Sequence, residues 1–159
     1  MGVALSEEIV QALGDPQAVK VIGTVDESGA PRLAVKDSLR LNAEGLLEYD
    51  EIIETSETNK GLIRALWFGG SVTALILAAN KRSYSINCRP LRTLIAGESY
   101  RARYRALRSS GLDTDLGAVW ILEPLGFQET SLEKRRVEEE AKHPLLRHLD
   151  RLAVPPSRK

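Results

Sequence analysis

Alternation of apolar and polar residues is the dominant pattern in this chain, and it is clearest between residues 32 and 41. Side chains there repeat with period two, as they do in a strand whose two faces meet different surroundings. One face is mainly apolar and comprises Leu33, Val35, Asp37, Leu39 and Leu41. The other carries cations and hydroxyls and comprises Arg32, Ala34, Lys36, Ser38 and Arg40. We expect one continuous strand whose apolar face lines the inside of a barrel.

Similar strand patterns recur along the chain between turns rich in Gly, Pro, Asn and Asp. They cover residues 19–25, 46–53, 71–79, 83–89, 91–96 and 118–130, the last bent at Pro124. The segment 71–79 is apolar almost throughout, which predicts a central strand buried on both faces. Helix patterns cover 6–13, 58–68, 98–109 and a charged C-terminal segment opened by Thr130 and Glu133 in a capping-box arrangement.

These elements predict an α+β protein built on a six-stranded antiparallel barrel with flanking helices and a C-terminal helix. Hairpin links between the first strands disfavour a doubly wound parallel sheet. We expect a single domain over residues 1–159, with a core at about 13–131 and a helical extension at 131–152. Pro144 interrupts that extension before a stripe formed by Leu145, Leu149 and Leu152.

Charge and composition exclude several classes of protein. The 22 basic and 22 acidic residues balance, which argues against a dedicated nucleic-acid binder, and no apolar run approaches a membrane span. The single cysteine, Cys88, rules out an internal disulfide and predicts a core thiol in a protein of the cytoplasm. His143 and His148 have no partner at metal spacing, so we expect no metal site.

The stretch ETSETNKGL, residues 54–62, is the main candidate for chemistry. It places hydroxyls, an amide, a lysine and a glycine at the start of a predicted helix. One interpretation is a simple helix cap with solvated lysines. The other is an anion site, because free N–H groups, hydroxyls and a cation meet there. If the adjacent strands pair, Lys36 and Ser38 can converge with the Thr55–Lys60 cluster on one phosphate.

The order of these features resembles the pyridoxamine 5′-phosphate oxidase-like, FMN-binding split-barrel superfamily. The resemblance covers about residues 13–131 and includes the Gly-x-Pro-Arg hairpin, the strand ending at Lys36-Asp37-Ser38, and the Thr55-Ser56-x-Thr58-Asn59-Lys60 signature. It implies a six-stranded split barrel that forms a homodimer and binds FMN between the subunits. By this carry-over, the flavin ring and ribityl chain lie along Lys36, Asp37 and Ser38. The phosphate is surrounded by Thr55, Ser56, Thr58, Asn59 and Lys60. Asn80-Lys81-Arg82 stands where members contribute further contacts.

The C-terminal segment lacks the substrate-binding Arg and His pattern of pyridoxamine phosphate oxidases, so we do not expect that activity. The resemblance instead implies an FMN-dependent oxidoreductase of the flavin-reductase type, with a donor such as reduced nicotinamide and no assigned catalytic side chain. Two alternatives stay open: a non-catalytic flavin carrier or electron-transfer protein, and a ligand-binding module without flavin. F420 and haem, used by other branches of the superfamily, also stay open as ligands.

The arginines of one predicted helix and the two tryptophans have simpler interpretations than a ligand site. The arginines of the predicted helix over 98–109 are expected to form a solvated face rather than a phosphate site. They are Arg101, Arg103, Arg105 and Arg108. Trp67 and Trp120 are expected in the core rather than against a flavin.

Overall fold

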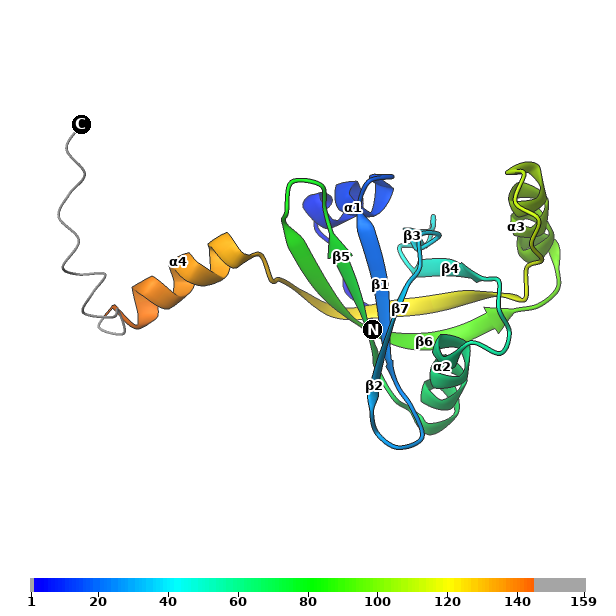
Figure 1. The fold of residues 1–159 in the computed structure, drawn as a ribbon, viewed down its shortest axis with the longest axis horizontal. Coiled ribbons are helices and arrows are strands. Elements are labelled where there is room, and N and C mark those ends of the chain that lie inside the picture. Colours follow the sequence, from blue (N-terminus) through cyan, green and yellow to red (C-terminus); the bar gives the residue numbers. More distant parts are fainter. Residues whose placement is uncertain (1, 145–159) are drawn as a thin grey trace.

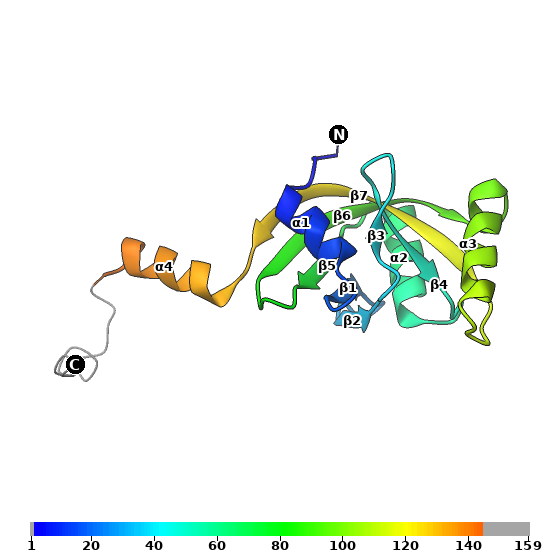
Figure 2. The same ribbon diagram turned by 90° about the horizontal axis from the view of Figure 1, so that it is seen from above.

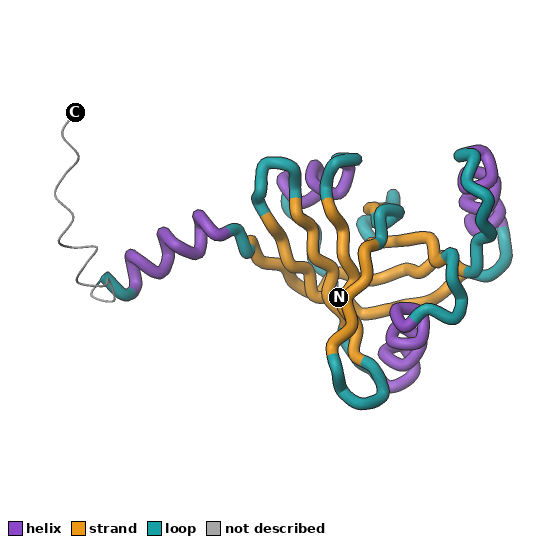
Figure 3. Tube along the Cα trace, viewed as in Figure 1, coloured by secondary structure: helices purple, strands orange, loops and turns teal. Residues whose placement is uncertain are grey.

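A computed structural model describes residues 2–144 of the chain. These residues form one curled, wholly antiparallel sheet of seven strands with four helices around it (Figures 1 and 3). The strand order is β2-β1-β5-β6-β7-β4-β3. The strands are β1 Val19–Val25, β2 Pro31–Val35, β3 Arg40–Leu41, β4 Leu47–Glu51, β5 Val72–Leu77, β6 Ser83–Leu94 and β7 Ala118–Glu129. The helices are α1 Glu7–Gly14, α2 Glu57–Phe68, α3 Glu98–Ser109 and α4 Leu132–Lys142.

The two edge strands are neighbours in the sequence although they lie at opposite ends of the strand order. A tight corner joins β2 to β3, in which the N–H of Leu39 donates to the carbonyl of Lys36. The chain therefore crosses from one edge of the curled sheet to the other within four residues. This crossing closes the sheet into a barrel and brings Lys36 beside the end of β4.

The corner divides the single strand expected over 32–41 into β2 and β3, so the sheet has seven strands although the two segments expected at 83–89 and 91–96 form the single strand β6. It also overturns the expected orientation, because Leu33 and Val35 are 78% and 60% exposed and point away from the barrel. Ala34 occupies the inner face of β2, opposite the fully buried Ile22. Only after the corner does an apolar side chain of this stretch, Leu39, enter the core.

The core fills the inside of the curled sheet and is covered by α1 and α2. Its largest fully buried side chains include Trp120, Tyr49, Ile9, Ile22, Leu39, Leu47, Leu62, Ile76, Ile86 and Leu122. Inward and outward residues alternate along β1 and β5, as expected for strands with one buried face. The prediction that 71–79 is buried on both faces is therefore wrong, since Leu75 and Leu77 are exposed on the outer face.

The long strands β6 and β7 each continue through a proline at which the sequence predicts a break or a bend. Residues 83–94 form one strand with a register shift beside Pro90, and β7 shifts register beside Pro124. Such irregularities add local bend and twist, which a curled sheet requires. Pro90 therefore bends a continuous strand and does not end it.

Helices α3 and α4 lie at opposite ends of the molecule, and neither contains a buried residue (Figures 1 and 2). The N-cap of α4 is Ser131, with no side-chain cap hydrogen bond, so the capping box expected at Thr130 is absent. Thr130 and Ser131 instead hydrogen-bond Ser83 at the start of β6. The predicted leucine stripe at 145–152 lies outside the described residues. No helix within residues 2–144 is long and apolar enough to span a membrane.

Candidate functional site: a buried carboxylate beneath the start of α2

The centre of the candidate site is Glu51, a fully buried carboxylate at the end of β4. The ammonium of Lys36 donates to both of its oxygens, at 2.9 Å to Oε2 and 3.1 Å to Oε1. The Lys36 side chain is only 13% exposed, and its Nζ also lies 5.2 Å from the ring centroid of Tyr49. Water screens such a buried pair weakly, so each ion depends strongly on the other.

Three further donors satisfy the Glu51 carboxylate. The Tyr49 hydroxyl and the Ser56 hydroxyl donate to Oε2, each at 3.0 Å, and the N–H of Ile53 donates to Oε1 at 3.1 Å. Burial, together with the nearby Glu51 charge, raises the pKa of Tyr49 well above its ordinary value, so the phenol keeps its proton and acts as a donor. The result is a fully hydrogen-bonded buried anion.

Ser56 connects this carboxylate to the first turn of α2. It is the N-cap of the helix, and its Oγ accepts the N–H of Asn59 at 3.0 Å. Asn59 is fixed from two further sides, donating to the carbonyl of Glu54 at 2.7 Å and accepting from the Trp120 indole at 2.8 Å. The start of the helix is thus anchored to the barrel core, while the N–H groups of Glu57 and Thr58 have no acceptor within the helix.

A close contact between α2 and β1 fixes the position of the helix on the sheet. A Cβ at Gly61 would lie 2.6 Å from both Cβ and Oγ1 of Thr24, so only glycine permits this approach. Thr24 is itself buried on the inner face of β1. This contact places one face of α2 against the β1–β2 hairpin.

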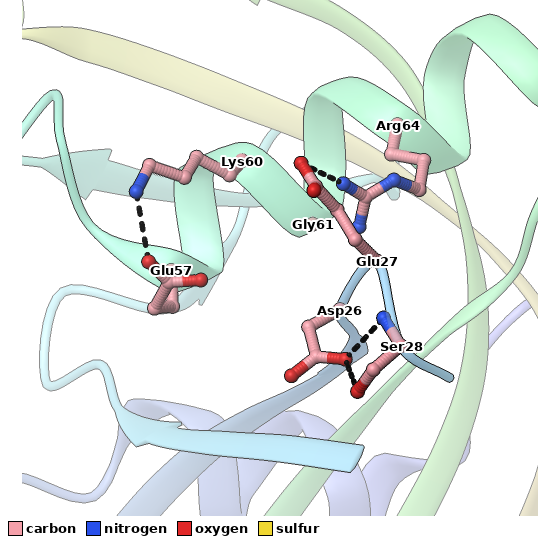
Figure 4. Close-up of a pocket in the computed structure, with 7 residues that line it drawn as sticks. All are labelled: Asp26, Glu27, Ser28, Glu57, Lys60, Gly61 and Arg64. Atoms are coloured by element: carbon pink, nitrogen blue, oxygen red, sulfur yellow. Dashed lines mark hydrogen bonds and ion pairs between the residues drawn. The ribbon is translucent and has the colours of Figure 1, made fainter. Parts of the chain in front are cut away.

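A pocket of about 310 Å³ opens between α2 and that hairpin (Figure 4). It is lined by Asp26, Glu27, Ser28, Glu57, Lys60, Gly61 and Arg64. Lys60 contacts Glu57 at 2.8 Å and Arg64 contacts Glu27 at 2.9 Å. The Lys60 hydrogen bond lowers the pKa of Glu57. These pairs are largely exposed and each contributes little, so an incoming anion can displace either carboxylate at small cost.

An apolar hollow of about 330 Å³ continues the pocket along the same helix and shares Asp26, Gly61 and Arg64 with it. Its other lining residues are Val25, Ala65, Phe68, Gly70, Ser71 and Val72. Together the two hollows form a groove with a charged end and an apolar end. This arrangement suits a ligand that combines an anionic group with an apolar body.

The predicted site residues do not all gather in one place. Lys36 and Ser56 meet at Glu51, and Lys60 lines the open pocket. Ser38 lies beside β4, where its Oγ accepts the N–H of Asp50 at 3.0 Å. Asp37 and Thr55 are exposed and Thr58 is buried. The two predicted clusters do converge, although the anion between Lys36 and Ser56 is the chain's own Glu51. The assignment of these residues to a flavin stays a prediction.

Asn80-Lys81-Arg82 lies away from this groove. Arg82 lines a separate hollow beside α1 and binds Glu129 at the end of β7 through two 3.1 Å hydrogen bonds. The hydrogen bonds from Arg82 and Ser131 lower the pKa of Glu129 to about 2. In this structure Arg82 therefore ties the β5–β6 turn to the end of β7.

Sequence reasoning missed Glu51 and Arg64. The alternation in 46–53 contained a signal for the first, because Leu47, Tyr49 and Glu51 share one face of the strand. A carboxylate on the inner face of a barrel strand requires a cation, and in the structure Lys36 supplies it. Arg64 follows Lys60 by four residues, so both lie on one helix face, but nothing in the sequence places the hairpin opposite them.

No family model matches the chain, and no curated protein matches it by sequence. Solved structures do match. HupZ of Group A Streptococcus has 17% identity and a TM-score of 0.65 over 80% of this chain and 95% of that chain. An FMN-binding protein from Syntrophomonas wolfei has 16% identity and a TM-score of 0.64 over 79% and 86%. A candidate pyridoxamine 5′-phosphate oxidase from Lactobacillus delbrueckii has 16% identity and a TM-score of 0.59 over 79% and 93%.

The chain has the pyridoxamine 5′-phosphate oxidase-like split-barrel fold. The expected fold class is thereby confirmed, with one strand more than expected. Proteins of different activity share this split barrel, since an F420 reductase also matches, with 14% identity and a TM-score of 0.58 over 79% of this chain and 98% of that chain. The function of this split barrel has to be argued from its own groove.

Proposed function

We propose that the chain is an FMN-binding flavoprotein that acts as an oxidoreductase. The observation that carries this proposal is the groove beside the first turns of α2, whose charged end is lined by both Lys60 and Arg64. A helix N-terminus with adjacent cations is a recurrent phosphate-binding arrangement. The same fold in the Syntrophomonas wolfei protein, which is described as FMN-binding, supports the choice of ligand.

Each part of the groove has a defined task in this proposal. Lys60 and Arg64 exchange their carboxylate partners for the phosphate, which lies beside the first turns of α2. The flavin supplies the hydride and electron transfer, with a reduced nicotinamide as the proposed donor. The ammonium of Lys36 is held by Glu51, so we expect the predicted contact of Lys36 with the ring to involve its stem or backbone. The single, buried Cys88 accords with a cytoplasmic protein.

We further propose that the protein is a homodimer joined through the outer face of β2, β1 and β5. Apolar side chains on this face lie opposite one another in register, as in Val35–Val21–Leu75 and Val19–Leu77. Leu33, Val25 and Leu77 are also exposed there. A contiguous apolar surface of this kind marks an interface, and a second copy would cover it.

Binding of FMN and of riboflavin, which lacks the phosphate, tests the proposed ligand. We expect the wild type to bind FMN, and the double variant Lys60→Ala/Arg64→Ala to weaken FMN binding by at least about tenfold with little effect on riboflavin. Arg101→Ala, an exposed arginine on α3, is the matched control and should change neither affinity. A colourless protein that fails to bind added FMN would overturn the proposal.

Turnover is tested separately, by following oxidation of reduced nicotinamides by the FMN-loaded protein with oxygen or an artificial acceptor. Steady oxidation supports the oxidoreductase. An FMN-loaded protein that oxidises neither NADH nor NADPH would favour the flavin carrier. Binding of F420 or haem in preference to FMN would keep the groove as a ligand site and replace the cofactor.

A further inference from the structure

Glu51 has no contact with solvent and no position in the open groove, yet it accepts hydrogen bonds from four residues. A buried carboxylate is costly unless it is fully paired, so a side chain of this kind is retained only where its pairing is complete. Each of its partners comes from a different part of the fold: the β2–β3 corner, β4, the loop 52–55 and the N-cap of α2. Glu51 therefore links the closure of the barrel to the start of α2.

The hydrogen bonds that link Glu51 to α2 have a defined donor and acceptor at each step. The Ser56 hydroxyl has one hydrogen, and it is donated to Glu51 Oε2. The lone pairs of Ser56 Oγ are then left to accept the N–H of Asn59. In parallel, Glu51 Oε1 holds the N–H of Ile53 and so fixes the loop that leads into the helix. Without this carboxylate, the hydroxyl is free to rotate and the loop loses its anchor.

The charge of Glu51 is neutralised at the same point. Lys36 contacts both carboxylate oxygens, so the buried group presents little net negative charge to the helix start above it. An unpaired carboxylate there would repel an anionic ligand. The pair thus supplies hydrogen-bond acceptors for the first turn of α2 without opposing an anion at that turn.

We propose that Glu51 is a positioning residue for the anionic group of the ligand, acting through Ser56 on the first turn of α2. This inference rests on the proposed function for the identity of the ligand. It assigns Glu51 no contact with the ligand. It predicts that loss of the carboxylate acceptor misplaces the first turn of α2 and weakens binding of the anionic group alone.

Two double variants separate the effect of the hydrogen-bond acceptor at position 51 from the effect of its charge. Lys36→Met/Glu51→Met removes the ion pair and the carboxylate that accepts from the Ser56 hydroxyl and the Ile53 N–H. Lys36→Met/Glu51→Gln removes the same charges and keeps an amide oxygen in place. The ratio of FMN to riboflavin affinity is the measurement, because any change at the ring or ribityl chain affects both ligands. We expect the Met variant to lower this ratio about tenfold relative to the Gln variant. Equal ratios in the two variants would overturn the proposal.

Amide hydrogen exchange tests the same inference without flavin. The N–H of Asn59 is protected by Ser56 Oγ, and we expect it to exchange about tenfold faster in the Met variant than in the Gln variant. Equal exchange at Asn59 would remove the relay through Ser56. If the wild type does not bind FMN, the proposed function fails while the exchange result still decides the relay.

A third variant covers the case in which the Met variant does not fold. Ser56→Ala breaks the connection and leaves the Lys36–Glu51 pair intact. It should lower the FMN-to-riboflavin ratio as the Met variant does. An unchanged ratio in Ser56→Ala would overturn the proposal.

Discussion

The ammonium of Lys36 lies 2.9 Å from Glu51 Oε2 and joins the two ends of the curled sheet. Lys36 follows the edge strand β2, whereas Glu51 ends β4, the neighbour of the opposite edge strand β3. An ion pair between these positions can form only when the sheet is closed. The pair therefore reports on closure of the barrel as well as on the groove beside α2.

Lys36→Met should destabilise the fold by about 3–5 kcal/mol, because it leaves Glu51 buried without a counter-ion. Chemical denaturation measures this loss. Adding Glu51→Met removes the stranded charge and should recover most of it, since a well-packed apolar pair often replaces a buried ion pair at little cost. A double variant as unstable as the single would show that the stability comes from the hydrogen bonds of Glu51 to Tyr49 and Ser56.

Arg103 joins the helix α3 to the sheet by donating to Asp50 at 3.1 Å and 2.6 Å, and Arg40 donates to the same carboxylate at 3.0 Å. Arg103→Ala should cost about 1–3 kcal/mol and increase amide exchange throughout α3, which has no buried residue of its own. Arg105→Ala, on an exposed part of the same helix, is the control and should have little effect. Equal exchange in both variants would refute the anchoring role.

Asp50 also gives a pH dependence with a defined sign. Burial alone would raise the pKa of Asp50, but the hydrogen bonds from Arg103 and Arg40 outweigh it and lower the pKa below the ordinary 3.8. The folded state thus binds the proton less readily than the unfolded state. The stabilisation is complete above about pH 4 and is lost as the pH falls through the lower, folded pKa. Between about pH 4 and the folded pKa of Asp50, the free energy of unfolding should fall more steeply with falling pH in the wild type than in Asp50→Asn.

Gly61→Ala should destabilise the protein although alanine is the better helix former. The gain in helix propensity is about 0.5–1 kcal/mol, whereas overpacking costs about 1–3 kcal/mol. The added Cβ would lie 2.6 Å from Thr24 Cβ, so the clash decides the sign. Gly14→Ala, where nothing lies within 4 Å of an added Cβ, should be neutral or stabilising in the same thermal or denaturant melt.

Leu33→Asp should convert the proposed dimer to a monomer, because it places a charge in the apolar face of β2, β1 and β5. Sedimentation velocity across a range of concentrations measures the change. Leu112→Asp, an equally drastic change at an exposed residue after α3, should leave the association state as it is in the wild type. A wild type that sediments as a monomer at every concentration would refute the proposed dimer.

Much of the fold was predictable from local patterns. The helices over 57–68 and 98–109 and the strand over 19–25 lie within a residue or so of their expected bounds, because periodicity and glycine stops specify them. The β2–β3 corner was not predictable, since a period-two pattern continues through it without a glycine or proline. The turn at residues 36–39 forms because the chain crosses there from one edge of the sheet to the other.

The site was less predictable because its partners are distant in sequence. Lys36 and Glu51 are 15 residues apart, and Asn59 and Trp120 are 61 apart, so no local motif encodes either contact. The arginines of α3 show the same limit. The expected solvated face accounts for Arg101, Arg105 and Arg108, whereas Arg103 faces inward to a carboxylate on β4.

Tryptophan fluorescence can report on the position of the helix α2. Trp120 is fully buried and its indole bonds Asn59 in the first turn of the helix, whereas Trp67, expected in the core, is 77% exposed near the other end. Replacing Trp67 by phenylalanine would leave a single indole in the barrel. The emission maximum and the anisotropy of Trp120 fluorescence would then follow, in real time, the packing of the first turn of α2 against the barrel.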